Sequence, residues 1–492
     1  MSELSQGWAT TRIGELTSKI GSGATPRGGA KAYKLSGTPL LRSLNIHFDG
    51  VRDKGIAFID EEQAAKLDNV QVETADVLLN ITGASIGRVA IAPERYEGAR
   101  VNQHVAIIRT VDGVEPSFLS RYLASPDAQA RILEENYGVT RQALTKGMIE
   151  DFPVYLPPLP EQRRIVAKLD RLSARSAAAR DLLARTTKLA TRAKQAILAH
   201  AFQGGLVDGS SIVVTSVPPR DELIRLRDER RTAEGLRKKG KNRSVPISSA
   251  VLPDVPGTWQ WLTFDDCSWD MTVGHVGPMK DRYVEDGIPF LRSLNVKPNA
   301  ISSRDIRYID TDFDEELRKS RLLPGDLVVV RTGEPGVAAV IDENLGLCNC
   351  SDLVISRLCQ FIDPHFAAYY MNSNFARHTS SAMQVGVAQR HFNVGAMSVM
   401  PVPLPPIEEQ VEIVRRIEAA FARIDRMTEE ASRAAHLLDR LDERLLAKAF
   451  RGKLVPQDPD DEPAEALLTR IREARAAAPK AERGRRKKID AE

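Results

Sequence analysis

The chain has 492 residues, which is longer than the ~250–300 residues that one hydrophobic core usually serves, so we expect more than one domain. Its hydrophobic content of 42%, charged content of 27% and formal net charge of +3 are ordinary, so any attraction to nucleic acid has to come from local clusters of charge. No run approaches the ~18–20 apolar residues of a membrane span and the N-terminus lacks the apolar core of a signal peptide, so we expect a cytoplasmic protein that does not bind membranes.

Residues 1–155 consist of short apolar runs punctuated by Gly, Pro, Asn and Asp. The stretch DVLLNITGASIGRVAIAP, from Asp76, predicts a strand, a tight turn and a second strand. The stretch SFLSRYLASPDAQARIL, from Ser117, predicts helix. We therefore expect a domain of mixed helices and strands over 1–155, in which Thr82-Gly83 is a hairpin turn rather than a ligand contact.

Residues 156–207 predict one long helix. The stretch LPPLPEQ supplies prolines that fit before or within a first turn and a glutamate that favours the positive N-terminal end of a helix. Alternating steps of four and three then fall mostly on apolar residues, which is typical of a coiled coil. The predicted seam of this helix contains Ile165, Leu169, Leu172, Leu183 and Ile197.

A basic linker, predicted to be helical, covers residues 208–250. Within it, residues 218–243 carry ten Lys/Arg against five Asp/Glu. Such a segment is either a solvated surface helix or a source of nonspecific phosphate contacts, and the sequence leaves both interpretations open.

From residue 251 the chain repeats itself. The phrase GTPLLRSLNI, from Gly37, returns as GIPFLRSLNV from Gly287, with seven of ten residues identical. VYLPPLPEQRRIV, from Val154, returns as VPLPPIEEQVEIV from Val402, and ILAHAFQGGLV returns as LLAKAFRGKLV. Several collinear anchors at distances of 248–250 residues indicate a tandem duplication.

The second copy is expected to place a mixed domain over 251–403, a long helix over 404–455 and a charged, partly disordered extension over 456–492. The predicted seam of the second helix contains Ile413, Ile417, Ile424, Leu438, Leu441 and Leu445.

Charge favours pairing of the two long helices with each other. Residues 160–202 carry ten Lys/Arg against three Asp/Glu, whereas residues 408–450 carry eight against ten. Since the first helix would repel its own copy, we expect the two helices to pair inside one chain. Each helix starts at the exit of its own domain and a duplicated unit favours two-fold symmetry, so we expect the pair to be antiparallel. The expected fold class is α+β: two similar mixed α/β domains joined by two long helices that form an intramolecular antiparallel coiled coil, as a pseudo-two-fold tandem repeat.

Two similar domains at a fixed separation suit duplex DNA, which presents a major-groove face every ~34 Å. Arg can bind guanine, and Asn or Gln can bind adenine, through two hydrogen bonds. The candidate DNA-binding residues lie in turn-rich segments of the two copies: Thr25, Arg27, Lys31, Arg42, Asn45, Arg141, Gln142, His275, Lys280, Arg282, Arg292, Asn295, Gln389 and Arg390. Each is otherwise a solvated loop residue, and the Arg and Asn of the repeated LRSLN are otherwise structural, bonding a neighbouring loop.

No catalytic apparatus is evident. The chain lacks G-x-x-x-x-G-K-[ST], G-x-S-x-G, H-E-x-x-H and the Asn/Asp-Pro-Pro-aromatic motif of amino-methyltransferases, and GSGATPRGG fails the G-x-G-x-x-G spacing. The pair Cys348 and Cys350 fits no standard zinc spacing, so we expect no metal site and buried thiols. These absences favour a binding protein, with a coiled-coil protein adaptor or a stand-alone DNA-modifying enzyme as the alternatives.

The order of segments resembles the specificity subunit of type I restriction-modification enzymes. The resemblance rests on a globular domain, an LPPLPEQ helix ending AFQGGLV, a second domain and an LPPIEEQ helix ending AFRGKLV, and it covers nearly the whole chain. It implies two target recognition domains that each read one half of a split DNA site, separated by the helices. It also implies two methyltransferase subunits that bring S-adenosylmethionine, and two restriction subunits that bring ATP and Mg²⁺, with no cofactor in this subunit.

Overall fold

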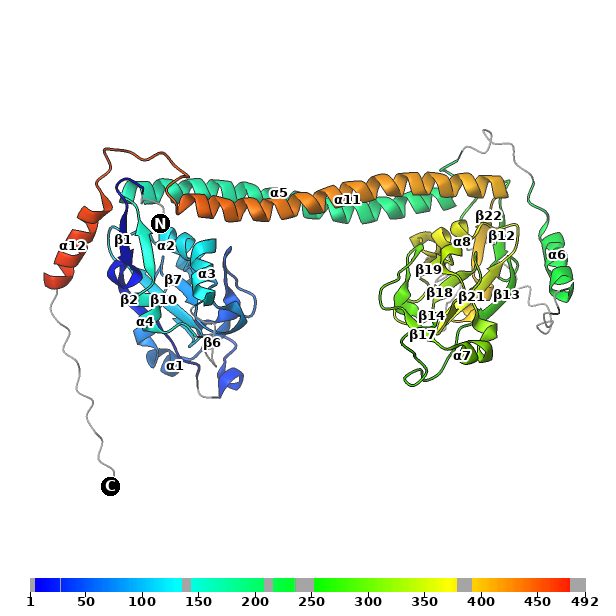
Figure 1. Cartoon of the computed structure of the whole chain (residues 1–492), viewed down its shortest axis with the longest axis horizontal. Helices are drawn as coiled ribbons and strands as arrows, with labels where there is room; N and C mark the ends of the chain where they lie inside the picture. Colours follow the sequence, from blue (N-terminus) through cyan, green and yellow to red (C-terminus); the bar gives the residue numbers. More distant parts are fainter. Residues whose placement is uncertain are drawn as a thin grey trace, which may run out of the picture. The chain divides into compact units, whose positions relative to one another are not determined.

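The computed structural model describes residues 5–26, 28–134, 143–207, 216–233, 235, 252–377 and 392–477. Two compact units divide the chain: Met1–Leu183 with Ser432–Glu492, and Ala184–Ala431. Each unit therefore combines one globular domain with part of each long helix (Figure 1). We call the described residues between 5 and 156 head 1, and those between 252 and 404 head 2.

Head 1 is built on two small sheets. A four-stranded antiparallel sheet has the order β2-β10-β7-β8, and a three-stranded sheet has the order β6-β3-β9 with β3 and β9 parallel. The strands are β2 (Thr17–Ser22), β3 (Thr38–Leu41), β6 (Ala57–Ile59), β7 (Val77–Asn80), β8 (Val89–Ile91), β9 (Arg100–Val101) and β10 (Val105–Thr110). Short pairs are formed by β1 (Ala9–Arg12) with β11 (Pro153–Leu156), and by β4 (Ile46–His47) with β5 (Gly50–Val51).

The four-stranded sheet of head 1 is buried on both faces, which explains its nearly continuous apolar strands. Successive residues of a strand point to opposite faces. Leu78 and Ile107 accordingly pack in a cluster with the three-stranded sheet, while Leu79 and Ile108 pack in a cluster with Phe118 of a helix. The head 1 helices are α1 (Glu61–Ala65), α2 (Pro116–Leu123), α3 (Pro126–Glu134) and α4 (Lys146–Glu150).

Head 2 repeats this topology. Its four-stranded sheet has the order β13-β21-β18-β19, and its three-stranded sheet has the order β17-β14-β20. The strands are β12 (Gln260–Thr263), β13 (Ser268–Val273), β14 (Ile288–Leu291), β15 (Val296–Lys297), β16 (Ala300–Ile301), β17 (Arg307–Ile309), β18 (Leu327–Val330), β19 (Ala338–Val340), β20 (Asn349–Cys350), β21 (Leu353–Leu358) and β22 (Pro401–Leu404). The helices are α7 (Thr311–Glu316), α8 (Pro364–Met371) and α10 (Val394–Val399).

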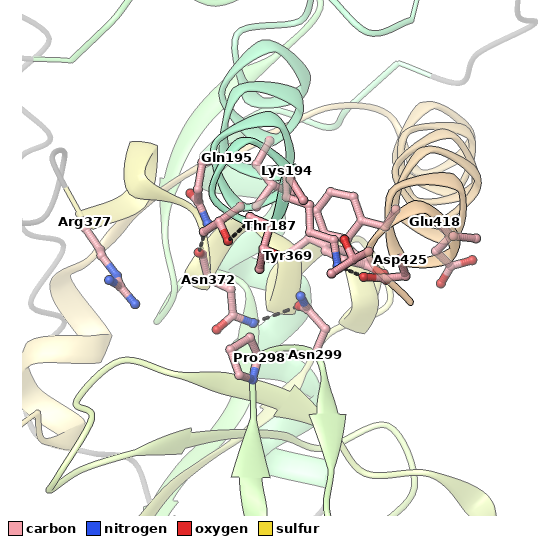
Figure 2. A pocket seen from close by; sticks show the side chains of 16 residues that line it. Thr187, Lys194, Gln195, Pro298, Asn299, Tyr369, Asn372, Arg377, Glu418 and Asp425 are labelled. Carbon is pink, nitrogen blue, oxygen red and sulfur yellow. Dashed lines mark hydrogen bonds and ion pairs between the residues drawn. The ribbon is translucent and has the colours of Figure 1, made fainter. Parts of the chain in front are cut away.

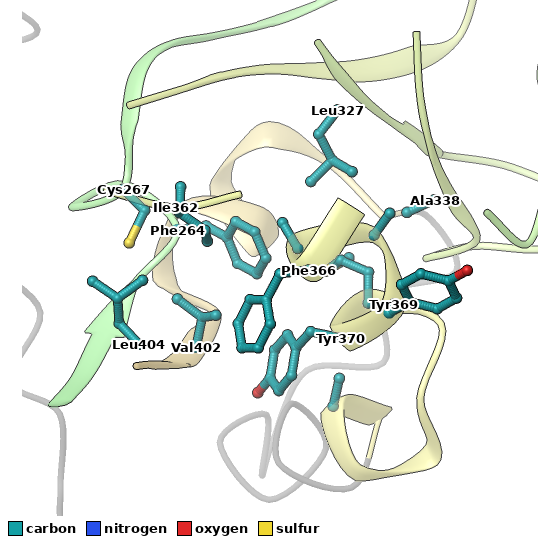
Figure 3. Packing of buried hydrophobic residues seen from close by; sticks show 14 of the residues in the cluster. Phe264, Cys267, Leu327, Ala338, Ile362, Phe366, Tyr369, Tyr370, Val402 and Leu404 are labelled. Atoms are coloured by element: carbon teal, nitrogen blue, oxygen red, sulfur yellow. The ribbon is translucent and has the colours of Figure 1, made fainter. Parts of the chain in front are cut away.

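Aromatic side chains of α8 fill the core of head 2 (Figure 3). Phe366 and Tyr370 are fully buried. Both rings contact the ring of Phe202, at the end of the first long helix, with ring-centroid distances of 5.3 and 5.2 Å. Edge-to-face pairs of this kind add to the burial of the rings. The helix that leaves head 1 therefore ends inside the core of head 2's unit.

The two long helices, α5 (Leu159–Phe202) and α11 (Ile407–Ala449), are antiparallel partners within each unit. In the first unit, the Ser176 hydroxyl donates to Asp442 over 2.8 Å. In the second, Lys194 bonds Asp425 over 2.6 Å. Early positions of one helix thus face late positions of the other, which confirms the predicted intramolecular antiparallel pair.

The seam of α11 departs from the prediction at Leu441. The other predicted seam residues are buried or half-buried, but the Leu441 side chain is 47% exposed. Its place is taken by Asp442, which turns inward and accepts hydrogen bonds from Ser176 and Arg180. A rule that counted only apolar residues missed this charged position, because the stabilisation there comes from a charge-assisted hydrogen bond.

The motifs LPPLPEQ and LPPIEEQ each join a long helix to its own head. The indole N–H of Trp8 donates to Glu161 and that of Trp259 donates to Glu409, each over 3.1 Å. The neighbouring Gln162 side chain accepts from the backbone N–H of Glu115 and donates to the carbonyl of Pro157. Glu409 is followed by a glutamine that makes the corresponding bonds in head 2. The repeated glutamate and glutamine therefore act as a joint.

Helices α6 (Arg220–Ala233) and α12 (Ala464–Ala477) belong to the heads rather than to solvent. In the linker helix α6, the Arg227 side chain is almost fully buried and donates to the carbonyl of Asp265 over 2.7 Å. In α12, Leu468 is fully buried in the core of head 1's unit and Arg472 pairs with Glu15 over 2.9 Å. The arginines named here are engaged with the head surfaces, which favours a packing role for the described part of each appendage.

No helix in the described part of the chain is long and apolar enough to cross a membrane. The four cysteine thiols are free and buried, and burial raises the pKa of Cys348 to about 11. Within the ranges that the structure describes, no three His, Cys, Asp or Glu side chains are grouped so as to hold a metal ion.

Candidate nucleic-acid interface

Four segments that are distant in sequence meet at one edge of head 1. The backbone N–H of Asn102 donates to the carbonyl of Leu41, the Asn80 amide donates to the carbonyl of Ser43, and the N–H of Gly23 donates to the carbonyl of Asn102, over 2.9–3.2 Å. We call this the convergent edge of head 1 and define it as Gly23 with residues 41–45, 80–85 and 102–104. It lies at the start of β10, whereas the far end of that strand lies next to Leu16, which packs in the same cluster as Ile165 of α5.

Head 2 has the same arrangement. The N–H of Ser351 donates to the carbonyl of Leu291 and the N–H of His275 donates to the carbonyl of Cys350, each over 2.9 Å. The convergent edge of head 2 comprises residues 274–275, 291–295, 330–336 and 349–352. The segment between β20 and β21 in head 2 (351–352) is one residue shorter than that between β9 and β10 in head 1 (102–104), so the two edges are similar and can be compared, but they are not identical.

One glycine of GSGATPRGG serves close packing of the backbone. A Cβ added at Gly23 would lie 1.6 Å from the carbonyl oxygen of Val101, and one added at Gly274 would lie 2.7 Å from that of Cys350. Real Cβ atoms do not approach so closely, so a side chain at either position would push two segments of the convergent edge apart. The requirement for glycine at these positions comes from the fold and does not need a bound phosphate.

Asn45 and Asn295 are fully buried, which favours the structural alternative for them. The Asn45 amide donates to the carbonyls of Arg52 and Lys54, and its oxygen accepts from the backbone N–H of Arg42. Asn295 makes the corresponding three bonds in head 2. The oxygen and the nitrogen of each amide are therefore both bonded inside the loop. This geometry supports a structural role for the two residues and not a direct contact with a base.

Arg42 and Arg292 support the same loops from outside. The Arg42 guanidinium donates to the carbonyl of Gly55 and lies over the Tyr33 ring, 5.1 Å from its centroid. Arg292 donates to the carbonyl of Asp305. Both acceptor residues have positive φ, 75° at Gly55 and 57° at Asp305. Glycine adopts this conformation freely, whereas it costs free energy at an aspartate, so Arg292 supports a strained turn and Arg42 an unstrained one.

The remaining candidates that the structure describes lie in the loops that precede the LRSLN phrase. Lys31 and Lys280 are exposed, Thr25 is half-buried and the guanidinium of Arg282 stacks over Phe313 at 4.7 Å. His275 contacts the same ring, so the structure brings His275 and Arg282 together. Arg27, Arg141, Gln142, Gln389 and Arg390 lie outside the described residues.

The Thr-Gly pairs are turns, as expected, but their threonines also reach across the edge. Gly83 and Gly333 have φ of 73° and 88° and lie between paired strands. The Thr82 hydroxyl bonds Nδ1 of His104 over 2.5 Å, and the Thr332 hydroxyl donates to Asp352. The sequence contains only one hint of this cluster, the repeated Thr-Gly, because its members are joined by tertiary contacts.

The two heads also differ in an ion pair at the end of the four-stranded sheet that lies away from the convergent edge. Asp76 accepts two hydrogen bonds from the guanidinium of Arg109, over 2.8 and 2.9 Å. In head 2 the closest approach of Asp326 and Arg357 is 3.9 Å, and burial raises the pKa of Asp326 to about 6. The carboxylate of Asp326 is therefore less well compensated than that of Asp76.

Pockets accompany both joints between a head and the helix pair. The pocket in the second unit, of about 570 Å³, is lined by α5, α11 and head 2 (Figure 2). Asn372 accepts from the Gln195 amide through its carbonyl, and Lys194 bonds Asp425 and lies over the Phe421 ring at 4.8 Å. A pocket of about 670 Å³ occupies the matched place in the first unit. The contacts in the second unit hold α5 on head 2 and against α11.

Comparisons with known proteins bear on this architecture. A family model described as the type I restriction modification DNA specificity domain matches residues 5–185 and 280–433. The chain is 28% identical over 393 residues to the type I restriction enzyme EcoBI specificity subunit of Escherichia coli, covering 78% of this chain and 77% of that protein. It is 23% identical to the EcoKI specificity subunit of E. coli K12, covering 97% of both.

Solved structures share the fold. One comes from a structure described as the structural basis of complex assembly and conformational transition of the type I R-M system. It matches with a TM-score of 0.66 and 19% identity, and the match covers 92% of this chain and 100% of that chain. Another is the HsdS subunit from Thermoanaerobacter tengcongensis, with TM-score 0.51, 19% identity and coverage of 92% and 98%. The two-fold match of the family model covers more than half of the sequence, and the chain belongs to the family of type I restriction-modification DNA specificity subunits.

Proposed function

We propose that this chain is the DNA-reading subunit of a type I restriction-modification complex, and that each head reads one half of a split, asymmetric site. The observation that supports this most strongly is that the two heads have the same fold but different side chains at the convergent edge. The two heads share one sheet topology and an equivalent backbone bond at the convergent edge, from Asn102 to Leu41 and from Ser351 to Leu291, while their side chains at that edge differ. Such a pair suits two half-sites of different sequence.

The long helices would set the unread spacer between the half-sites. They contain 44 and 43 residues, so each is about 65 Å long at ~1.5 Å per residue. That length exceeds one ~34 Å turn of duplex DNA. As modules we propose the two recognition domains over 1–155 and 251–403, the spacer helices over 156–207 and 404–455, the linker over 208–250 and the extension over 456–492.

The proposed partners supply the chemistry. Two methyltransferase subunits would bring S-adenosylmethionine, and two restriction and translocase subunits would bring ATP and Mg²⁺. The chain itself is proposed to be non-catalytic and to hold no cofactor. We expect it to act in the prokaryotic cytoplasm, on double-stranded DNA.

Domain exchange tests the proposal. Residues 1–155 are replaced by the corresponding head of a family member with a different target, and the complex with methyltransferase subunits is assayed for sequence-specific methylation. We expect one half-site to change and the other to stay. A change in both half-sites together would contradict the proposal, and so would methylation or cleavage by the chain alone.

A further inference from the structure

The convergent edges carry different side chains on matched backbone positions. The residue before the repeated threonine is Ile81 in head 1 and Arg331 in head 2. Both carbonyls accept an equivalent backbone bond, from Leu144 over 2.9 Å and from Phe392 over 3.1 Å. Ile81 is buried, whereas the Arg331 side chain is 25% exposed. The backbone at this position is therefore held in the same way in both heads, whereas the side chain is specific to one head.

The second difference lies in the segment that the threonines contact. Head 1 has Gln103 and His104 there, and head 2 has Asp352. The Gln103 side chain is exposed, but its backbone is held on both sides. Asn102 is buried and bonds Leu41, and the N–H of His104 donates to the Asn102 side chain over 3.1 Å. Such support fixes where the Gln103 side chain starts.

In head 2 the matched site is a charged pair. Arg331 bonds Asp352 over 3.1 Å, and the Thr332 hydroxyl donates to the other oxygen of the same carboxylate. The Arg331 Nε is buried and has no hydrogen-bond partner within the part of the chain that the structure describes. The Asp352 side chain is 33% exposed. The pair is thus positioned by the fold, open to solvent and incompletely hydrogen-bonded.

We propose that Gln103 determines specificity in the half-site read by head 1, and that Arg331 with Asp352 does so in the half-site read by head 2. This inference rests on the proposed function. A glutamine amide pairs with the N6 and N7 edge of adenine, an arginine with the O6 and N7 edge of guanine, and a carboxylate accepts from the amino group of cytosine. The first half-site should therefore contain an A·T pair read by Gln103, and the second a G·C pair read by Arg331 and Asp352.

Gln103→Ala and Arg331→Ala are assayed in the complex with methyltransferase subunits, against duplexes in which each base pair of each half-site is changed in turn. We expect Gln103→Ala to lose about tenfold discrimination at one A·T pair of the first half-site and none in the second. Arg331→Ala should lose discrimination at one G·C pair of the second half-site alone. Glu62→Ala and Arg318→Ala, on exposed helical turns of heads 1 and 2, are the matched controls and should match the unmodified chain.

Gln103→Glu guards against loss of folding, since it keeps the side-chain volume. It should move the preference at the same position from adenine towards cytosine. The inference is overturned if Gln103 and Arg331 variants keep full discrimination everywhere, or if they weaken all duplexes alike. If domain exchange moves one half-site while these variants move nothing, the proposed function stands and only the residue assignment fails. If domain exchange moves neither half-site, both fail.

Discussion

Glu161 is a buried carboxylate at the joint between α5 and head 1. One of its oxygens accepts from Trp8, and the other is buried with no hydrogen-bond partner in the described structure. Burial raises the pKa of Glu161 from 4.5 to about 7. The folded chain therefore keeps a proton up to about pH 7 that the unfolded chain loses near pH 4.5.

Glu161 makes the stability of the folded chain depend on pH. Because the folded-state pKa is the higher one, this group favours folding below pH 4.5, and the contribution is lost as the pH rises through 7. Glu161→Gln removes the titration and keeps an acceptor for Trp8. We expect the unfolding temperature of this variant to fall less between pH 5 and pH 8 than that of the unmodified chain. Glu62→Gln, at an exposed position, is the control, and equal slopes for all three proteins would refute the assignment.

Substitution of Asn45 distinguishes a structural role of its amide from a direct DNA contact. Since all three of its hydrogen bonds are internal, Asn45→Ala leaves buried backbone groups unpaired and should lower the free energy of unfolding by about 2–4 kcal/mol. Chemical unfolding measures this, and Asn295→Ala should behave alike because its bonds are equivalent. Unchanged stability combined with a loss of base discrimination would instead make Asn45 a direct contact.

At the level of elements, the ion pairs between the two long helices all have the same polarity, with the cation on one helix and the anion on the other. Arg180 of α5 pairs with Asp439 and Asp442 of α11, and Lys194 of α5 pairs with Asp425 of α11. In both units the basic partner is on α5 and the acidic partner on α11. Two copies of the same helix would bring like charges together, so these pairs favour α5 with α11.

A double-mutant cycle tests this pairing. Asp442→Arg should destabilise the first unit by placing two cations at one contact, and adding Arg180→Asp should recover about 1 kcal/mol of the loss in the unfolding free energy. Asp181→Arg, on an exposed position of α5, should couple with neither change. Strict additivity of the Asp442 and Arg180 effects would show that the contact contributes nothing to pairing.

The appendage α12 is expected to stabilise the first unit. Leu468 is fully buried in the cluster that contains Phe118 of head 1 and Phe450 at the end of α11. Leu468→Ala should cost about 2–5 kcal/mol of stability. Hydrogen exchange should locate the loss in head 1 and leave head 2 protected as before. Leu441→Ala is the matched control because that leucine is half exposed, and an equal cost there would restore it to the seam.

At the level of the whole molecule, the sequence predicted the duplication, the mixed domains and the antiparallel helices, because repeats and apolar periodicity are local properties of the chain. The departures involve tertiary contacts. Leu441 gave way to Asp442 because Ser176 and Arg180 supply polar partners from another helix. The role of Asn45 depends on a loop that folds back on it.

The candidate site was less predictable. The loops before LRSLN are recognisable in the sequence by their basic residues. Gln103 and Arg331 have no such local pattern, because only the folded chain brings their four segments together at one edge. The Trp8–Glu161 joint links residues 153 positions apart and has no local signal. A pattern search finds residues that are alike in the two copies, and specificity has to lie in residues that differ.

The two heads of one chain are proposed to read two different half-sites separated by a spacer. Mapping of methylated bases in the host genome, with and without this gene, measures this most directly. We predict a motif of two dissimilar specified halves around unspecified bases, with a methylated adenine that disappears when the gene is removed. A contiguous motif, two identical halves, or a methylation pattern that is unchanged by removal of the gene would contradict the claim.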